Sequence, residues 1–238
     1  MVFILALAKI MLVNIVLSGD NAVVIALAGR SLPKRQQTLA ILWGCAGAVV
    51  LRVLLTLVAV FLLSIPYLQA VGGLLLIWIA AKLLNEPDDD EEEIKSNGTL
   101  LAAIRTIIIA DIVMSLDNTL AIAAIAENDY LLLTLGLALS VPIIVFGSKF
   151  IMWLMERFPV IVYIGAGLIC WTAGEMLVRD DRVRELLNIL LQRGILSEHV
   201  LQALGLAVPV TATIGVLLPC WLLNRRKQQR MKAGGVRS

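Results

Sequence analysis

The chain has 238 residues, of which 60% are hydrophobic and 16% charged, and its mean hydropathy is +0.91. Soluble domains carry about 25% charged residues, so this composition is typical of a protein that crosses a membrane several times. The net charge is only +2 and the basic residues gather at the ends of apolar runs, which excludes a nucleic-acid-binding protein.

Seven apolar runs, each about the length of a membrane-spanning helix, follow one another along the chain. We therefore predict an all-α, polytopic membrane protein with seven transmembrane helices. The first run has no basic segment and no small-residue cleavage site, so we expect it to be a spanning helix and not a signal peptide. The runs are 3–29, 39–63, 66–84, 100–126, 131–155, 160–178 and 204–223.

The connections between the runs divide the chain into five parts. An acidic linker separates the third and fourth runs, and its charges indicate a solvated segment. Between the sixth and seventh runs, charged and apolar residues mix as they do in an amphipathic helix that lies on a membrane. The predicted parts are a first three-helix repeat (1–84), the linker (85–99), a second three-helix repeat (100–178), the amphipathic loop (179–203), and a seventh helix with a basic tail (204–238).

The Lys and Arg residues are unequally shared between alternate connections. Thirteen lie on the side that holds residues 30–35 and the C-terminal tail, and four lie on the opposite side, all in the 179–199 segment. Cytoplasmic connections carry the excess of basic residues. We therefore expect the N-terminus outside the cell and the C-terminus in the cytoplasm.

The chain contains an internal repeat. The segment NIVLSGDNAVVIA from Asn14 aligns with DIVMSLDNTLAIA from Asp111, with seven of thirteen positions identical. The third and sixth runs also align, at an offset of 93 that pairs Trp78 with Trp171. Three helices are an odd number, so the second copy enters the membrane from the opposite side. This is the inverted repeat of many secondary transporters, whose sites lie near the membrane midplane between the repeats.

Two carboxylates, Asp20 and Asp117, lie deep within apolar runs. A charge at such a depth costs at least ~2.5–3.5 kcal/mol, so it needs a partner, a cavity or a cation. At about 100° per residue, polar side chains form a stripe along each helix. Gly19 indicates that the first helix unwinds at this point, whereas the fourth has Leu116 there. The two stripes contain Asn14, Ser18 and Asn21, and Asp111, Ser115 and Asn118.

Carboxylate, amide and hydroxyl oxygens are hard ligands, which suit Mn²⁺, Mg²⁺ or Ca²⁺ better than Zn²⁺ or Cu(I). The sequence therefore predicts a divalent-cation site built from Asp20, Asn21, Asp111, Asp117 and Asn118 with Asn14, Ser18 and Ser115. A structural alternative stays open, in which Asp20 and Asp117 pair with Arg52 and Lys149. Arg52, Lys149 and Glu175 are also candidates for a proton relay.

The two segments NIVLSGDN and DIVMSLDN, each at the start of a three-helix repeat, resemble those of the TerC family of membrane proteins. The short seven-helix chain is similar to the YjbE-type branch of that family, and the resemblance covers residues 1 to about 223. Asp20, Asn21, Asp111, Asp117 and Asn118 match the family pattern, whereas Asn14 stands where members carry an acidic residue. The resemblance implies export of metal ions, principally manganese, across the bacterial cytoplasmic membrane.

The remaining motifs exclude several mechanisms. His199 is the single histidine, Cys45, Cys170 and Cys220 are isolated, and no glycine-rich phosphate loop occurs, so we expect neither an enzyme nor an ATP-driven pump. Proton antiport is the expected drive. We expect no tightly bound cofactor, and as partners the lipids, the transported Mn²⁺ and a second copy of the chain. The alternatives are a scaffold for membrane-protein assembly or metal delivery, and an exporter of small solutes.

Overall fold

The computed structural model describes residues 2–17, 19–63, 65–85, 96–126 and 130–234, and every element in these ranges is a helix. The linker residues 86–95, the 127–129 turn and Ser18 lie outside the described residues. The helices are α1 (Val2–Leu17), α2 (Gly19–Gly29), α3 (Lys34–Leu63), α4 (Leu68–Asn85), α5 (Ser96–Ala126), α6 (Tyr130–Arg157), α7 (Val160–Arg179), α8 (Asp181–Gln192) and α9 (Glu198–Gly234).

Five of these helices, α3, α4, α6, α7 and α9, are long and apolar enough to cross a membrane, and the α1–α2 pair adds a sixth if it forms one span. The prediction of an all-α, multi-pass membrane protein is therefore confirmed. The remaining apolar run forms α5, which packs along α3. The count of seven spans stays a prediction.

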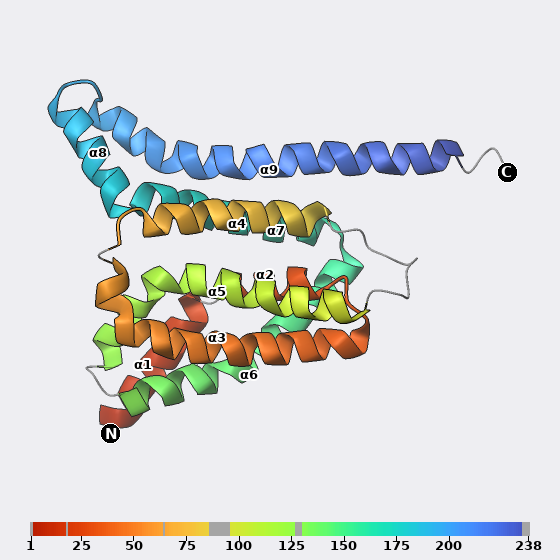
Figure 1. Ribbon diagram of the computed structural model, residues 1–238, viewed down its shortest axis with the longest axis horizontal. Helices are drawn as coiled ribbons and strands as arrows, with labels where there is room; N and C mark the ends of the chain where they lie inside the picture. The colour runs from red at the N-terminus through yellow and green to blue at the C-terminus, as the bar shows by residue number, and fades with distance from the viewer. Residues whose placement is uncertain (1, 18, 64, 86–95, 127–129, 235–238) are drawn as a thin grey trace.

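The helices are arranged in three layers (Figure 1). One layer holds α1, α2, α3, α5 and α6, the next holds α4 and α7, and α9 lies along the outer side of α4 and α7. The first two layers share a core of buried aliphatic side chains, in which α2 and α5 contact α7 and α4. Because α2 lies in the middle of these contacts, its residues from Asn21 to Gly29 are buried within the protein.

The first apolar run is two helices and not one. The axes of Leu7–Asn14 and Gly19–Gly29 differ by 51°, so the chain bends where α1 gives way to α2. The run contains Gly19, the residue with the lowest cost in an irregular backbone, and Gly19 is the first residue of α2. By contrast, α5 is a continuous helix across Leu116. The two repeats therefore differ in backbone at matched positions.

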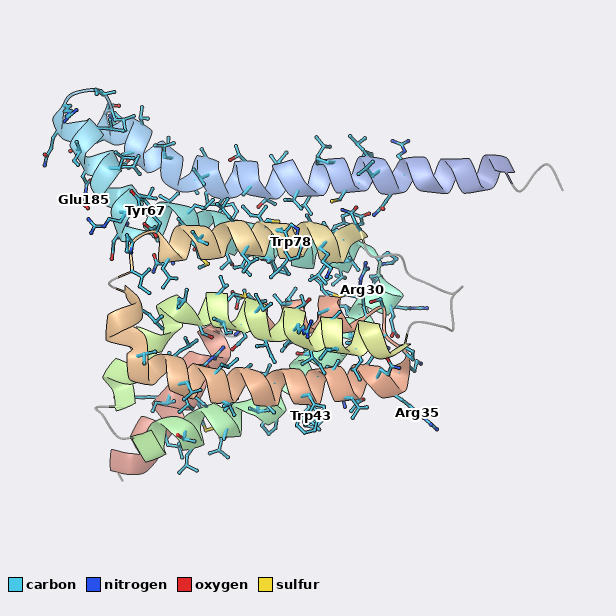
Figure 2. All side chains as sticks on the ribbon, in the orientation of Figure 1. Arg30, Arg35, Trp43, Tyr67, Trp78 and Glu185 are labelled. Atoms are coloured by element: carbon cyan, nitrogen blue, oxygen red, sulfur yellow. The ribbon has the colours of Figure 1, made fainter. Side chains whose placement is uncertain are left out.

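The two ends of the helix bundle carry different residues. Arg30 and Arg35 lie at the end where α9 finishes, and Tyr67 and Glu185 lie at the opposite end, where α1 begins (Figures 1 and 2). This grouping is the one that alternate crossings of a membrane produce. Which end faces the cytoplasm stays a prediction from the charge count.

The seventh apolar run extends further than we predicted, since α9 covers 37 residues and not 204–223. At its start, the Ser197 hydroxyl accepts a hydrogen bond from the backbone N–H of Val200, as N-cap residues do. At its other end, Arg, Lys and Gln have high helix propensity and continue the helix beyond the apolar run. The predicted 179–203 loop is thus mostly helical, with α8 as its amphipathic part.

Asp180 fixes the corner between α7 and α8. Its side chain, only 3% exposed, accepts hydrogen bonds from the backbone N–H groups of Arg182 (3.0 Å) and Val183 (3.3 Å), and from that of Ala70 on α4 (3.2 Å). It therefore caps α8 and ties it to the start of α4.

We expect Asp180→Ala to loosen α8, because losing an N-cap costs about 0.5–2 kcal/mol. An opening free energy lowered by about 0.5–2 kcal/mol raises the open population roughly 2- to 30-fold. Tryptic cleavage after Arg184 and Arg193 in detergent should accelerate by that factor. Asp181→Ala is the matched control, since Asp181 is exposed and lies within α8. Equal cleavage rates in both variants would show that the cap does not hold the corner.

Candidate functional site

A small cavity of about 20 Å³ lies where α1, α2, α3, α5 and α6 meet. A volume of roughly 10–15 Å³ holds one water molecule, so this cavity has room for one water-sized ligand or ion. Five buried polar residues line the cavity, and a sixth, Ser115, donates a hydrogen bond to one of them; each of the six is 8% exposed or less. We call them the polar cluster: Asn14, Asn21, Arg52, Asp111, Ser115 and Ser140.

Asp111 on α5 is the centre of the polar cluster. Its Oδ1 accepts hydrogen bonds from Arg52 Nη2 (2.5 Å) and from Asn21 Nδ2 (2.9 Å). Its Oδ2 accepts one from the hydroxyl of Ser115 (3.3 Å), one helical turn along α5. The predicted shared face of Asp111 and Ser115 is therefore confirmed. Burying a carboxylate is costly unless it is paired and hydrogen-bonded, and here both conditions are met.

Arg52 on α3 joins the two repeats. One arm of its guanidinium forms the ion pair with Asp111, and the other donates to Asn14 Oδ1. Asn14 in turn donates from Nδ2 to the hydroxyl of Ser140, which donates to the backbone carbonyl of Leu137 (2.7 Å). Asn14 and Asp111 are the matched first positions of the repeated segments. The guanidinium thus bridges two positions that the repeat makes equivalent.

Asn21, in the first turn of α2, has one polar atom without a partner. Its side chain is 2% exposed and its Nδ2 donates to Asp111, but its Oδ1 has no hydrogen bond. Turning the amide over would place two oxygens against each other, so the Asp111 contact fixes the orientation. A buried acceptor left unpaired costs about 1–3 kcal/mol. The cavity therefore has an oxygen available to a cation.

The other predicted residues of the repeated segments are placed as follows. Asp20 is partly exposed, does not line the cavity, and accepts a hydrogen bond from the backbone N–H of Asn21 (2.9 Å). Its carboxylate lies at the N-terminus of α2, where the helix dipole favours negative charge. Ser18 lies outside the described residues, as do the side chains of Asp117 and Asn118, although α5 is helical through both positions.

Lys149 and Glu175 do not belong to the polar cluster. Lys149 is exposed and lines a separate depression of about 290 Å³ between α3 and α6, together with Lys34 and Glu156. Glu175 accepts a hydrogen bond from Trp171 Nε1 (3.0 Å) and forms an ion pair with Arg179 (3.1 Å) near the end of α7. Of the three predicted ion-pair or relay residues, the structure brings only Arg52 to the cavity.

Among the residues that the structure describes, no three His, Cys, Asp or Glu side chains lie close enough together to hold a metal ion. The oxygens at the cavity come instead from one carboxylate and from amides and hydroxyls. Cys45 also lines the cavity and carries a free thiol. The cavity wall therefore offers hard oxygen atoms and one soft sulfur.

Sequence reasoning missed Ser140 and the pairing of Arg52 with Asp111. Ser140 is a single serine in an apolar run, two residues before Pro142, a pattern that is also common where helices simply pack. The structural alternative paired Arg52 with Asp20 or Asp117; the structure pairs it with Asp111, and the side chain of Asp117 lies outside the described residues. The rotation of α3 against α5, which sequence periodicity does not specify, decides the partner.

The sequence matches the family described as integral membrane protein TerC family over residues 1–229. The chain belongs to the TerC family. No solved structure matches it. The chain is 42% identical to the membrane protein YjbE of Bacillus subtilis (strain 168) over 212 residues, which are 89% of this chain and 95% of that protein.

The chain is also similar to two further proteins over shorter segments. The inner membrane protein YgdQ of Escherichia coli (strain K12) is 29% identical over 65% of this chain and 72% of its own length. The tellurium resistance protein TerC of Serratia marcescens is 34% identical over 32% of this chain and 23% of its own length. This chain is therefore a multi-pass membrane protein of the TerC family.

Proposed function

We propose that this TerC-family chain is a secondary transporter that exports a divalent metal ion, with Mn²⁺ as the first candidate, across the bacterial cytoplasmic membrane. One observation carries the proposal: a buried carboxylate, Asp111, and an unpaired amide oxygen, Asn21 Oδ1, lie together at a cavity beside a break in a membrane-embedded helix pair. Intramembrane ionisable residues mark ion pathways in membrane proteins. Broken helices line the binding sites of many transporters.

The ligand chemistry supports a hard divalent cation. Carboxylate, amide and hydroxyl oxygens from Asp111, Asn21 and Ser115 suit Mn²⁺, Mg²⁺ and Ca²⁺. The thiol of Cys45 makes Zn²⁺ the most informative competitor.

The packing of the helices supports an inverted repeat of α1–α2, α3 and α4 with α5, α6 and α7. Helix α3 of the first set packs on α5 of the second set, and correspondingly α6 of the second set packs on α1 and α2 of the first. Likewise α4 contacts α5, and α7 contacts α2. Each contact maps onto another when the two sets are exchanged, as two-fold related halves require. Such halves rock against each other about a central site in many transporters.

Energetics supports coupling to protons. Moving a divalent cation out of a cell with a negative interior costs about 4.6 kcal/mol per 100 mV, and a tenfold concentration gradient returns only ~1.4 kcal/mol. Passive export would fail under these conditions. The sequence has no nucleotide-binding loop, so exchange against protons is the proposed source of energy.

Metal uptake into inside-out membrane vesicles tests the proposal, because export from the cell becomes uptake in these vesicles. We expect acidification of the vesicle interior to drive uptake of radiolabelled Mn²⁺ in vesicles with the protein and not in vesicles without it. Zn²⁺, Ca²⁺ and Mg²⁺ are measured in parallel, and a protease-accessible tag after Ser238 checks the orientation. Correctly inserted protein that takes up none of the four ions would favour the scaffold alternative.

A further inference from the structure

We infer that Arg52 is a counter-cation within the chain, which neutralises Asp111 when no metal is bound and which an incoming metal ion displaces. This inference rests on the proposed function and specifies how its site is occupied between transport events. The guanidinium and a divalent cation would compete for the same carboxylate oxygen, Asp111 Oδ1.

Arg52 makes contacts that place its charge on Asp111. Its side chain is 4% exposed, starts on α3, forms an ion pair with Asp111 on α5, and donates a hydrogen bond to Asn14 on α1. A guanidinium stays protonated at physiological pH. Arg52 therefore holds a permanent positive charge at the cavity. In the metal-free protein this charge neutralises the carboxylate of Asp111.

Asn21 offers an oxygen atom without a hydrogen bond beside the same carboxylate. Asn21 donates to Asp111 Oδ1, the same atom that Arg52 contacts, while its own Oδ1 stays unpaired at the cavity. Arg52 carries N–H donors, but none of them reaches Asn21 Oδ1 in this structure. A metal ion between Asp111 and Asn21 Oδ1 would satisfy both oxygens. Its charge would repel the guanidinium, because two cations at one carboxylate in a low-dielectric interior strongly disfavour each other.

Displacement has a consequence for transport. A proton antiporter that has released its metal returns empty of metal but with protons bound, and an unpaired buried carboxylate makes that return costly. Because Arg52 neutralises Asp111, the protons of the antiport bind at other groups. With Arg52 on Asp111, the empty protein is already neutral at this position. The same contact lowers the apparent affinity for the metal, because only the fraction with Asp111 released binds it. Arg52 thus weakens binding and permits the empty return.

Fluxes of purified protein in liposomes separate these effects. Liposomes loaded with radiolabelled Mn²⁺ are diluted into buffer with chelator, which reports net efflux, or with unlabelled Mn²⁺, which reports exchange. The buffer is held at about pH 8 on both sides, where carboxylates are largely ionised. The variants are R52Q and the control R182Q, since Arg182 pairs with Glu185 on the exposed surface of α8. Mn²⁺ affinity is measured on the same preparations.

We expect exchange to exceed net efflux by at most about threefold in the wild type and R182Q, because the empty form returns readily. In R52Q we expect exchange to persist, the ratio to rise at least about tenfold, and Mn²⁺ to bind roughly tenfold more tightly as the competing cation is removed. A purely structural role for Arg52 would instead lower binding and both fluxes together.

Several results would overturn the inference. An R52Q protein with the wild-type ratio, or one that elutes normally in size exclusion but loses binding and exchange together, contradicts it. If R52Q does not fold, the wild-type protein alone tests the inference. Exchange that exceeds net efflux more than about tenfold in the wild type would contradict it, because the metal-free form would then not return. Wild-type protein that moves no Mn²⁺ in either assay contradicts the proposed function itself.

Discussion

Asp111→Asn should reduce metal export more than about 100-fold, because even outer-shell partners of a metal site contribute 10- to 100-fold in affinity. Asp111 supplies the carboxylate of the polar cluster that the described side chains form. Asparagine keeps the volume and loses the charge. Export is measured as Mn²⁺ uptake into inside-out vesicles, and normal uptake by this variant would remove Asp111 from the site.

The same substitution should also destabilise the protein, because the buried guanidinium of Arg52 loses the carboxylate of Asp111 as its ion-pair partner. Breaking a buried pair from one side costs about 3–5 kcal/mol. The double variant Asp111→Asn with Arg52→Gln removes both charges and provides the control. We expect it to regain most of the lost thermal stability in detergent while export stays absent. Recovery of export in the double variant would show that Asp111→Asn acts only through folding.

Gly174→Ala should separate α9 from the rest of the bundle. A Cβ atom at Gly174 would lie 2.4 Å from Cα and 2.9 Å from N of Pro209, so backbone meets backbone and no side chain can move aside. Overpacking of this kind costs typically about 1–3 kcal/mol. The control is Gly215→Ala on α9, where nothing lies within 4 Å of the added atom.

The expected result is a lower unfolding midpoint in detergent for Gly174→Ala and an unchanged or slightly higher one for Gly215→Ala, since alanine favours helices. Mn²⁺ affinity should stay unchanged in both variants, because α9 packs on α4 and α7 and its residues do not line the cavity. A normal midpoint for Gly174→Ala would mean that α7 and α9 are packed less closely.

The length and spacing of the apolar runs predicted most of the helices. The runs at 66–84 and 160–178 match α4 and α7 within a few residues, because both begin after a proline and end at polar residues. The start of α2 was also predictable, since Gly19 interrupts a polar stripe. The full length of α9 was not predictable from hydropathy, because its last turns are rich in Arg, Lys and Gln, which are polar but have high helix propensity.

The site was predictable one helix at a time but not between helices. Periodicity places Asp111 and Ser115 on one face of α5, and the structure joins them by a hydrogen bond. Periodicity does not give the rotation of α3 and α6 about their axes. The contacts of Arg52 with Asp111, and of Asn14 with Ser140, depend on those rotations. The cavity could therefore not be predicted from the sequence.

A crystal structure with Mn²⁺, with diffraction measured at the manganese absorption edge, tests the central claim most directly. We predict an anomalous peak in the cavity, at about 2.0–2.6 Å from Asp111 and from Asn21 Oδ1, which is the range of hard divalent cations and oxygen ligands. Arg52 should then have left Asp111. A peak only at the surface, with the ion pair of Arg52 and Asp111 intact, would contradict the account.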